Sequence, residues 1–240
     1  MPTDRPTVAI LCGGRGTRLQ EAAPALPKPL VEIGGRPILW HVMQIYLAQG
    51  FRSFLLLTGH RAEQVQDYVE AQSWPEGTKA RCLYTGEHTP TGGRLLQSAA
   101  VLGGRRFCAT YADGVADIDL TALLAWHHGH GADATMTVVR PRLQFGVADL
   151  NGDGLVRGFV EKPRSERWVN GGFFCFEPSV FDSLESDSSL EQDTLAGLAR
   201  AGRLRAFRHD GFWDCLDTYK DAIELGDLWA AGKAPWKLWG

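Results

Sequence analysis

The residue types best suited to chemistry gather in a glycine-rich loop near the start of the chain. The apolar run Val8–Leu11 before this loop predicts a buried first strand. The loop reads Leu11-Cys12-Gly13-Gly14-Arg15-Gly16-Thr17-Arg18-Leu19, and Pro27-Lys28-Pro29 follows. Its glycines remove side chains where the backbone turns, so several N–H groups can face one anion. Because arginines and a lysine add positive charge at the same place, the loop predicts a polyphosphate site.

The spacing of the loop glycines excludes two common phosphate-binding motifs. A Walker A loop needs Gly-x-x-x-x-Gly-Lys-Ser/Thr, and no such string occurs in the chain. A dinucleotide fingerprint needs Gly-x-Gly-x-x-Gly, and Leu19 stands where Gly14-Arg15-Gly16 would need its last glycine. A glycine-rich turn with solvated arginines is the remaining alternative.

Asp113 is well placed to hold a divalent metal ion, and Asp217 is a second carboxylate far away in the sequence. Asp113 follows a predicted strand at 107–111, and ligands in open α/β sheets bind beyond the carboxyl ends of strands. Asp217 precedes a helical pattern at 218–230. A magnesium site shared with phosphates usually takes one or two carboxylates of this kind. The alternatives are an Asp-Gly turn for Asp113 and a helix N-cap for Asp217, with Asp214 as a nearby competitor.

Two lysines stand beside prolines. Lys28 lies between Pro27 and Pro29, which fix their own φ angles and bias the lysine towards extended geometry. The backbone at Lys28 is therefore restrained, and its side chain can neutralise charge on a triphosphate. Lys162, in Glu161-Lys162-Pro163, has the same kind of support. The alternative for each is a solvated loop lysine.

Two further glycine pairs carry polar neighbours. Asn170-Gly171-Gly172 offers an amide and bare backbone, which suits sugar hydroxyls, or it is simply a turn before a strand. Thr91-Gly92-Gly93-Arg94 stands at a predicted helix start, where bare backbone would let a planar base approach closely. Base recognition is the role that the family resemblance given below implies for this stretch, with Arg94 donating to a base carbonyl such as O2 of cytosine.

Two other patterns resemble metal sites and are interpreted otherwise. The string 149–154 matches the start of a calcium loop, but Val160 stands at its twelfth position and the flanks are strand-like, which favours a hairpin. His127, His128 and His130 cluster at a predicted helix end, where cations interact favourably with the helix dipole. We expect no metal at either place.

The elements that must position these residues alternate between strand and helix in the first half of the chain. Strands are predicted at 8–11, 54–57, 81–84, 107–111 and 134–139, and helices at 37–49, 62–70, 94–101 and 119–128. The second half predicts a hairpin at 145–150 and 155–160, a strand at 173–176, a short helix at 178–184, then helix, strand and helix at 190–200, 204–207 and 218–230. Such alternation predicts an α/β fold with a mainly parallel, mixed sheet flanked by helices, in a single domain spanning 1–240.

Composition narrows the class of protein. The chain has 240 residues, 44% hydrophobic and 22% charged, as in an ordinary globule. Its net charge of −3 argues against a general nucleic-acid binder. No apolar run predicts a membrane span or a secretory leader. Five scattered cysteines, an odd number without a Cys-x-x-Cys pair, favour a reducing cytoplasm.

The glycine loop with Pro27-Lys28-Pro29 resembles the signature of the sugar-1-phosphate nucleotidyltransferases. Further strings are similar to one branch of that family, the glucose-1-phosphate cytidylyltransferases, and they run in family order. They are Val31-Glu32-Ile33-Gly34-Gly35-Arg36-Pro37-Ile38-Leu39-Trp40-His41, Thr91-Gly92-Gly93-Arg94-Leu95, Asp113-Gly114-Val115-Ala116-Asp117, Glu161-Lys162-Pro163, Asn170-Gly171-Gly172-Phe173-Phe174, Gly211-Phe212-Trp213 and Gly232-Lys233-Ala234-Pro235-Trp236-Lys237. Ala112 departs from the family, which usually has glycine there.

The resemblance implies a Rossmann-like nucleotidyltransferase fold and a reaction. CTP would donate CMP to a sugar 1-phosphate, with α-D-glucose 1-phosphate as the preferred acceptor, in a Mg2+-dependent homo-oligomeric enzyme. It implies Arg18 and Lys28 as catalytic residues and Asp113 and Asp217 as metal ligands. Implied nucleotide contacts are Leu11, Cys12, Gly13, Gly14, Arg15, Gly16, Thr17, Thr91, Gly92, Gly93, Arg94 and Ala112; implied sugar-phosphate contacts are Glu161, Lys162, Asn170 and Gly171. The alternatives are another base, another phosphorylated acceptor, or a sensor that keeps the fold without turnover.

Overall fold

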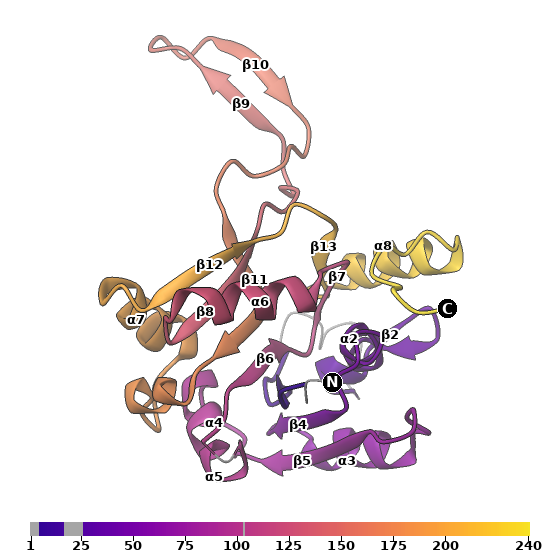
Figure 1. Cartoon of the computed structure of the whole chain (residues 1–240). Helices are drawn as coiled ribbons and strands as arrows, with labels where there is room; N and C mark the ends of the chain where they lie inside the picture. Colours follow the sequence, from indigo (N-terminus) through magenta and orange to yellow (C-terminus); the bar gives the residue numbers. More distant parts are fainter. Residues whose placement is uncertain (1–4, 17–25, 103) are drawn as a thin grey trace.

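A seven-stranded sheet forms the centre of the molecule in the computed structural model, which describes residues 5–16, 26–102 and 104–240 (Figure 1). Its strand order is β12-β8-β11-β6-β1-β4-β5. The strands are β1 (Val8–Leu11), β4 (Ser53–Thr58), β5 (Lys79–Tyr84), β6 (Phe107–Tyr111), β8 (Ala134–Val139), β11 (Val169–Phe176) and β12 (Leu204–Arg208). β11 runs antiparallel to both of its neighbours, and the other described pairs in this sheet are parallel. The predicted mixed, mainly parallel sheet is confirmed.

The central strand β1 is buried on both faces because its side chains alternate between two apolar clusters. Val8 and Ile10 face one cluster, and Ala9 and Leu11 face the other. β4 alternates in the same way. A central strand that is covered on both faces of the sheet therefore needs an apolar residue at every position.

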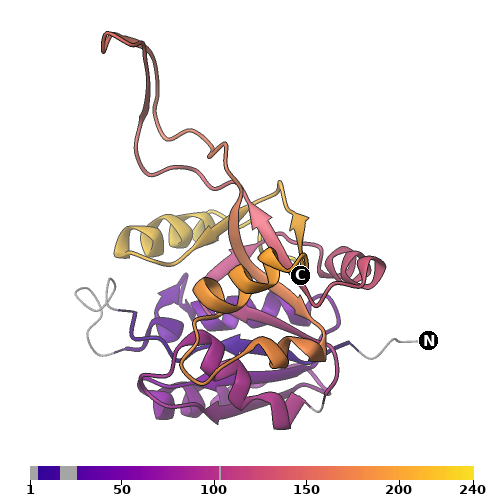
Figure 2. The same ribbon diagram turned by 90° about the vertical axis from the view of Figure 1, so that its left-hand side faces the viewer.

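Helices cover both faces of the sheet (Figure 2). The first cluster is closed by α2 (Ile38–Leu47), α3 (Ala62–Ala71), α6 (Leu120–His130) and α8 (Tyr219–Ala230). The second is closed by α4 (Thr91–Gln97), α5 (Ala99–Leu102), a 3-10 turn at Pro178–Ser183, a π-helical segment at Leu190–Leu195 and α7 (Ala196–Arg200). Among the described residues, no helix is long and apolar enough to cross a membrane.

Two predicted helices differ from the observed ones, and two short strand pairs were not predicted. The helix expected at 94–101 begins earlier, at Thr91, and is divided at Ser98, whose hydroxyl donates 2.6 Å to the carbonyl of Leu95. The helix expected at 190–200 starts as a π-helical segment before it becomes α7. Two short pairs escaped prediction: β2 (Glu32–Ile33) with β3 (Arg36–Pro37), and β7 (Gly114–Ala116) with β13 (Trp213–Cys215).

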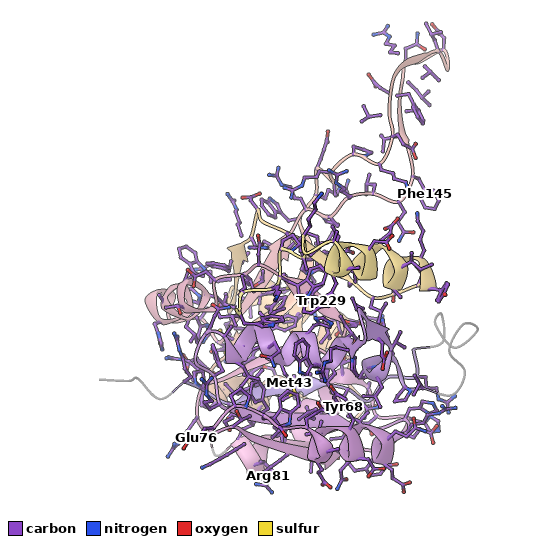
Figure 3. All side chains as sticks on the ribbon, turned by 90° about the vertical axis from the view of Figure 1, so that its right-hand side faces the viewer. Met43, Tyr68, Glu76, Arg81, Phe145 and Trp229 are labelled. Atoms are coloured by element: carbon purple, nitrogen blue, oxygen red, sulfur yellow. The ribbon has the colours of Figure 1, made fainter. Side chains whose placement is uncertain are left out.

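A hairpin projects far from the body as an arm, formed by residues 143–168 (Figure 1). Its strands are β9 (Val147–Leu150) and β10 (Val156–Val160), and Asn151 Oδ1 accepts hydrogen bonds from the turn N–H groups of Asp153 and Leu155. The hairpin interpretation of 149–154 is confirmed. Figure 3 shows side chains along the arm, Phe145 among them, standing clear of the body.

The histidine cluster at the end of α6 is part of the packing. The side chain of His127 is buried, and His127 and His130 both contact the hydroxyl of Thr135. Burial lowers the pKa of His127 to about 4, so this ring stays neutral. No cluster of three or more metal-ligating side chains occurs in the part of the chain that the structure describes.

Candidate active site

Lys28, Asp113 and Asp217 meet at one point above the carboxyl edge of the sheet. The Lys28 Nζ lies 2.6 Å from Asp113 Oδ2 and 3.0 Å from Asp217 Oδ1. The three side chains are 16%, 27% and 37% exposed, so the group opens to solvent on the aspartate side. The sequence singled out all three residues separately, and the fold brings them together.

The short pairing of β7 with β13 brings the two aspartates together. Asp113 immediately precedes β7, and Gly114 in β7 is paired with Cys215 in β13. The N–H of Leu216 donates 2.9 Å to the carbonyl of Asp113, so the chain reaches Asp217 beside it. This antiparallel pair brings together two residues far apart in the sequence.

Lys28 is positioned by a 3-10 turn, Lys28–Leu30, that follows Pro27. Gly16, in the glycine loop, has a φ of +59° and packs against the lysine stem: a Cβ there would lie 2.7 Å from Lys28 Cβ. The loop and the lysine are therefore fitted to each other, which explains a glycine at this position.

The helix-cap alternative for Asp217 does not hold. Thr218 is the N-cap of α8, and it forms a capping box with Asp221. The carboxylate of Asp217 instead accepts a hydrogen bond from Lys28. Asp214, the competitor, points elsewhere, since its Oδ1 accepts from the N–H of Cys215. Asp217 is thus the carboxylate that shares a cation with Asp113.

Electrostatics favour the charged form of the lysine. Burial opposes the charge, but attraction to Asp113 and hydrogen bonds to both aspartates outweigh it and raise the pKa of Lys28 above its ordinary value. Two carboxylates that already converge on one cation, with solvent beside them, are a donor set that suits Mg2+, which keeps several waters and binds phosphate oxygens. The residues present therefore fit a magnesium ion.

A pocket of about 290 Å³ is lined by the glycine loop, and we call it the nucleotide pocket after the role that the sequence analysis predicts for that loop. Predicted residues that line it are Leu11, Cys12, Gly13, Gly14, Gly16, Lys28, Thr91, Arg94, Ala112 and Asp113. Arg15, Gly92 and Gly93 are described by the structure but do not line it. Thr17 and Arg18 lie outside the described residues. Most of the predicted phosphate and base contacts thus share one cavity.

The guanidinium of Arg94 links the backbone of the glycine loop to neighbouring segments by hydrogen bonds. Its guanidinium donates to the Gly13 carbonyl (3.0 Å), the Thr58 carbonyl (3.0 Å) and the Thr85 hydroxyl (2.6 Å), and to the carbonyls of Gly86 and Glu87. A Cβ on Gly13 would collide with the guanidinium. In this structure the guanidinium of Arg94 therefore holds the loop. It is not positioned for the predicted hydrogen bond to a base.

The glycine pair of α4 serves packing. A Cβ on Gly92 would collide with the Ser188 hydroxyl, and one on Gly93 would collide with the Ser186 carbonyl. The N–H of Gly93 donates 3.2 Å to the carbonyl of Ser188. We expected bare backbone here so that a base could approach, and the structure instead shows the 186–188 loop in that space.

Arg15 does not line the pocket. Its guanidinium forms an exposed ion pair with Glu87, 3.1 Å between Nη2 and Oε1. His60 Nδ1 lies 3.2 Å from the same carboxylate oxygen. Arg15 is therefore paired with a residue whose backbone carbonyl also accepts a hydrogen bond from Arg94.

A second pocket, of about 220 Å³, adjoins the first; we call it the acceptor pocket. Asn170 and Gly171 line it with Asp217 and Trp213, whose Nε1 donates 2.8 Å to the Gly171 carbonyl. Tyr111 and Asp113 line both pockets. The lysine–aspartate group therefore stands where the two cavities meet.

The other two predicted sugar-phosphate residues lie apart from Asn170 and Gly171. Glu161 is exposed at the end of β10, and Lys162 lines a third cavity of about 420 Å³ at the base of the arm. Trp213 lines this cavity and the acceptor pocket. Asn170 and Gly171 thus line one cavity and Lys162 lines its neighbour, while Glu161 lines neither of the two.

Sequence reasoning missed two residues that line the acceptor pocket. Tyr111 was assigned to the end of a strand, and Trp213 was only part of a family string. One signal could have identified Tyr111: it is a large polar aromatic residue at the carboxyl end of a parallel strand, directly before Ala112-Asp113. Trp213 gave no signal of its own, because its strand has only three residues.

Comparison with known proteins places this geometry in a family. The model of the nucleotidyl transferase family matches residues 7–224. The chain belongs to the nucleotidyl transferase family. This nucleotidyltransferase is 40% identical to a protein named probable glucose-1-phosphate cytidylyltransferase from Bacillus subtilis (strain 168), over 96% of this chain and 98% of that one. It is 41% identical to the glucose-1-phosphate cytidylyltransferase of Salmonella typhimurium, over the same shares.

A solved structure shares the fold of this nucleotidyltransferase. The crystal structure of HddC from Yersinia pseudotuberculosis superposes with a TM-score of 0.74 and 23% identity, covering 93% of this chain and 99% of that one. The predicted Rossmann-like nucleotidyltransferase fold is thereby confirmed.

Proposed function

We propose that this nucleotidyltransferase transfers CMP from CTP to α-D-glucose 1-phosphate with Mg2+, and releases pyrophosphate. The observation that carries the proposal is the meeting of two pockets at Asp113. One pocket has a glycine loop suited to a triphosphate, and the other has an amide and bare backbone suited to a sugar. Lys28 and Asp217 lie at the same junction.

The reaction needs alignment and charge rather than an enzyme nucleophile. A phosphate oxygen of the sugar 1-phosphate is already ionised at neutral pH and attacks the α-phosphorus of CTP. A new O–P bond forms while the bond to the bridging oxygen of pyrophosphate breaks, in line. The acceptor pocket holds the attacking phosphate on one side of Asp113, and the nucleotide pocket holds the triphosphate on the other. Orientation of this kind supplies a large part of such rate enhancements.

Charge at the junction stabilises the transition state. Lys28, kept protonated by its two carboxylates, reaches the phosphates as charge moves onto the leaving pyrophosphate. Bound Mg2+ would supply positive charge against the phosphate oxygens from Asp113 and Asp217. We assign the sugar phosphate to Asn170, Gly171, Lys162 and Glu161, as the family resemblance implies.

The names of the relatives support the choice of substrates. Both bacterial relatives at about 40% identity are named for CTP-dependent chemistry on glucose 1-phosphate. A more distant relative, at 30% identity over 89% of the chain, is named mannose-1-phosphate guanylyltransferase catalytic subunit beta, from Drosophila melanogaster. A panel of CTP, UTP, dTTP and GTP against glucose 1-phosphate and mannose 1-phosphate, scored by pyrophosphate release, separates these possibilities. The highest kcat/KM is expected for CTP with glucose 1-phosphate; a higher value for another pair would overturn the assignment.

We also propose that the protein assembles as a homo-oligomer through the arm. Apolar side chains are exposed along residues 143–168, with Phe145 78% exposed (Figure 3). The others are Leu143, Val147, Leu150, Leu155, Val156, Phe159 and Val160. A lone two-stranded hairpin is marginal in water and offers unpaired edges, and a second copy supplies an identical apolar hairpin to cover it.

Light scattering of the intact protein tests the assembly. Phe145→Asp with Phe159→Asp should convert an oligomer to a monomer, because a buried carboxylate would oppose the contact. Val101→Asp, on an exposed apolar position of the body, should leave the mass unchanged. A wild-type monomer would refute the arm as an oligomer contact.

We propose that the protein is a single-domain enzyme and that it acts in the cytoplasm. Cys108 and Cys175 lie with their sulfur atoms 3.7 Å apart in the core without a disulfide. Free thiols in such proximity suit a reducing compartment.

A further inference from the structure

Glu191 is hydrogen-bonded to residues that line the nucleotide pocket and the acceptor pocket, but it lines neither of them. It is the second residue of the π-helical segment Leu190–Leu195. The Thr91 hydroxyl donates to its Oε2 at 2.6 Å, and the Tyr111 hydroxyl donates to its Oε1 at 2.5 Å. The hydroxyl of Ser189 also donates to Oε2, at 2.8 Å. One carboxylate thus holds three hydroxyl groups.

Each end of this group reaches a different pocket. Thr91 lines the nucleotide pocket, and Tyr111 lines both pockets. The Tyr111 oxygen accepts a hydrogen bond of 3.0 Å from Asn170 Nδ2, and Asn170 lines the acceptor pocket. An unbroken chain of hydrogen bonds therefore runs from Thr91 through Glu191 and Tyr111 to Asn170.

Glu191 is the charged acceptor of this chain. Burial opposes the charge of Glu191, but the hydrogen bonds from Thr91, Tyr111 and Ser189 outweigh it and lower its pKa. Hydrogen bonds to a charged acceptor are stronger than those between neutral groups.

Surrounding groups hold the two ends in place. The ring of Tyr111 rests against Gly172, whose φ is +78° and where a Cβ would lie 2.6 Å from Tyr111 Cδ2. The oxygen of Thr91 also accepts from the N–H of Leu190, at 2.9 Å. A π-helical turn is rare and is often found at functional sites, and here it presents Glu191 between α4 and β6.

We infer that Glu191 is a positioning residue, which sets the nucleotide pocket and the acceptor pocket relative to each other by holding Thr91 and Tyr111 on one carboxylate. The inference rests on the proposed transfer between those two pockets. In-line attack requires the two substrates to be aligned closely, and small misplacements cost large factors in rate. A residue that touches both walls and neither substrate can affect both substrates at once.

The test compares Glu191→Gln with Glu185→Gln in the full-length enzyme. Glutamine has one acceptor oxygen and a donor amide, so it cannot accept from Thr91, Ser189 and Tyr111 together. Glu185 is an exposed carboxylate on the preceding loop, and its variant should behave as wild type. Glu191→Gln should lower kcat/KM roughly tenfold for the nucleotide and for the sugar phosphate, as expected for loss of a charged hydrogen bond. Glu191→Asp, which keeps the charge, should recover part of the loss.

A double variant distinguishes positioning from simple support. Tyr111→Phe removes the same bond from the other side, so Glu191→Gln with Tyr111→Phe should be little worse than the worse single variant. The inference fails if Glu191→Gln lowers the melting temperature but leaves both kinetic constants unchanged, if only one substrate is affected, or if the two losses multiply.

Failure of the proposed function would be visible separately. Kinetic constants are taken with whichever nucleotide and sugar phosphate the wild type uses best, so a base other than cytosine would refute the substrate assignment and leave the Glu191 comparison intact. Calorimetric binding of that same best nucleotide to the wild type and to the variants provides the comparison without turnover. Equal nucleotide affinity in wild type and Glu191→Gln would then overturn the inference.

Discussion

The ammonium of Lys28 holds two carboxylates that would otherwise repel each other. Lys28→Ala should lower kcat/KM by about 10² or more, as for loss of one preorganised stabiliser of the transition state. It should also tighten binding of Mg2+ to the nucleotide-free protein, because the cation that now occupies the pair is gone. Steady-state kinetics and calorimetry measure the two effects. Lys79→Ala, an exposed lysine on β5, is the control; near-normal turnover in Lys28→Ala would make Lys28 a solvated loop residue.

Asp113 and Asp217 should act as one unit. Asp113→Asn and Asp217→Asn should each raise the magnesium concentration needed for half-maximal rate and depress turnover severely. The double variant should be little worse than the worse single one. Asp221→Asn, which alters the capping box of α8 without touching Lys28, should lower the melting temperature and leave the magnesium requirement intact. Were Asp217→Asn to behave like Asp221→Asn, the second metal carboxylate would have to be another residue.

At the scale of elements, β13 carries a carboxylate that the fold disfavours. Burial raises the pKa of Asp214 to about 6, with Asp221 and Glu224 adding to the rise and the N–H of Cys215 opposing it. Because the folded pKa lies above the ordinary value of about 3.9, stability should fall as pH rises from about 4 to 6 and stay level above that. Asp214→Asn should therefore be more stable at pH 7, by on the order of 2 kcal/mol, and equal to wild type at pH 4. Urea titrations at the two pH values measure this; an equal difference at both would show that charge is not the cause.

The sequence predicted the long elements because apolar periodicity and caps reveal them. The glycine loop, Lys28 and Asp113 could be found from residue type and strand position, whereas Asp217 was found through the family resemblance. The pairing of β7 with β13, which places the aspartates, could not, since three-residue strands have no periodicity. The packing role of Gly92 and Gly93 could not be predicted either, because the loop that packs against them comes from residues 186–188. A helical pattern at 190–200 likewise gave no sign that its first turn is π-helical and directs Glu191 to Tyr111.

At the scale of the whole molecule, the C-terminal tail closes the first core cluster. Trp236 is fully buried, stacks on Phe212, and donates from Nε1 to His41 Nδ1 at 3.3 Å. Figure 3 shows Trp229 of α8 in the same region, above Met43. Trp236→Ala should lower the free energy of unfolding by about 3–5 kcal/mol. Trp126→Ala, at an exposed tryptophan on α6, should cost about 0.5 kcal/mol; equal losses in denaturant titrations would contradict a buried anchor.

The central claim is that one phosphate oxygen of the sugar 1-phosphate attacks the α-phosphorus of the nucleotide at the junction of the two pockets. The most direct measurement uses glucose 1-phosphate carrying ¹⁸O in all its phosphate oxygens, with unlabelled CTP, and mass spectrometry of the products. The account predicts CDP-glucose that retains every labelled oxygen and pyrophosphate that contains none, because the attacking oxygen becomes the bridge of the new diphosphate. Label in pyrophosphate, or no CDP-glucose from the wild-type enzyme, would contradict it.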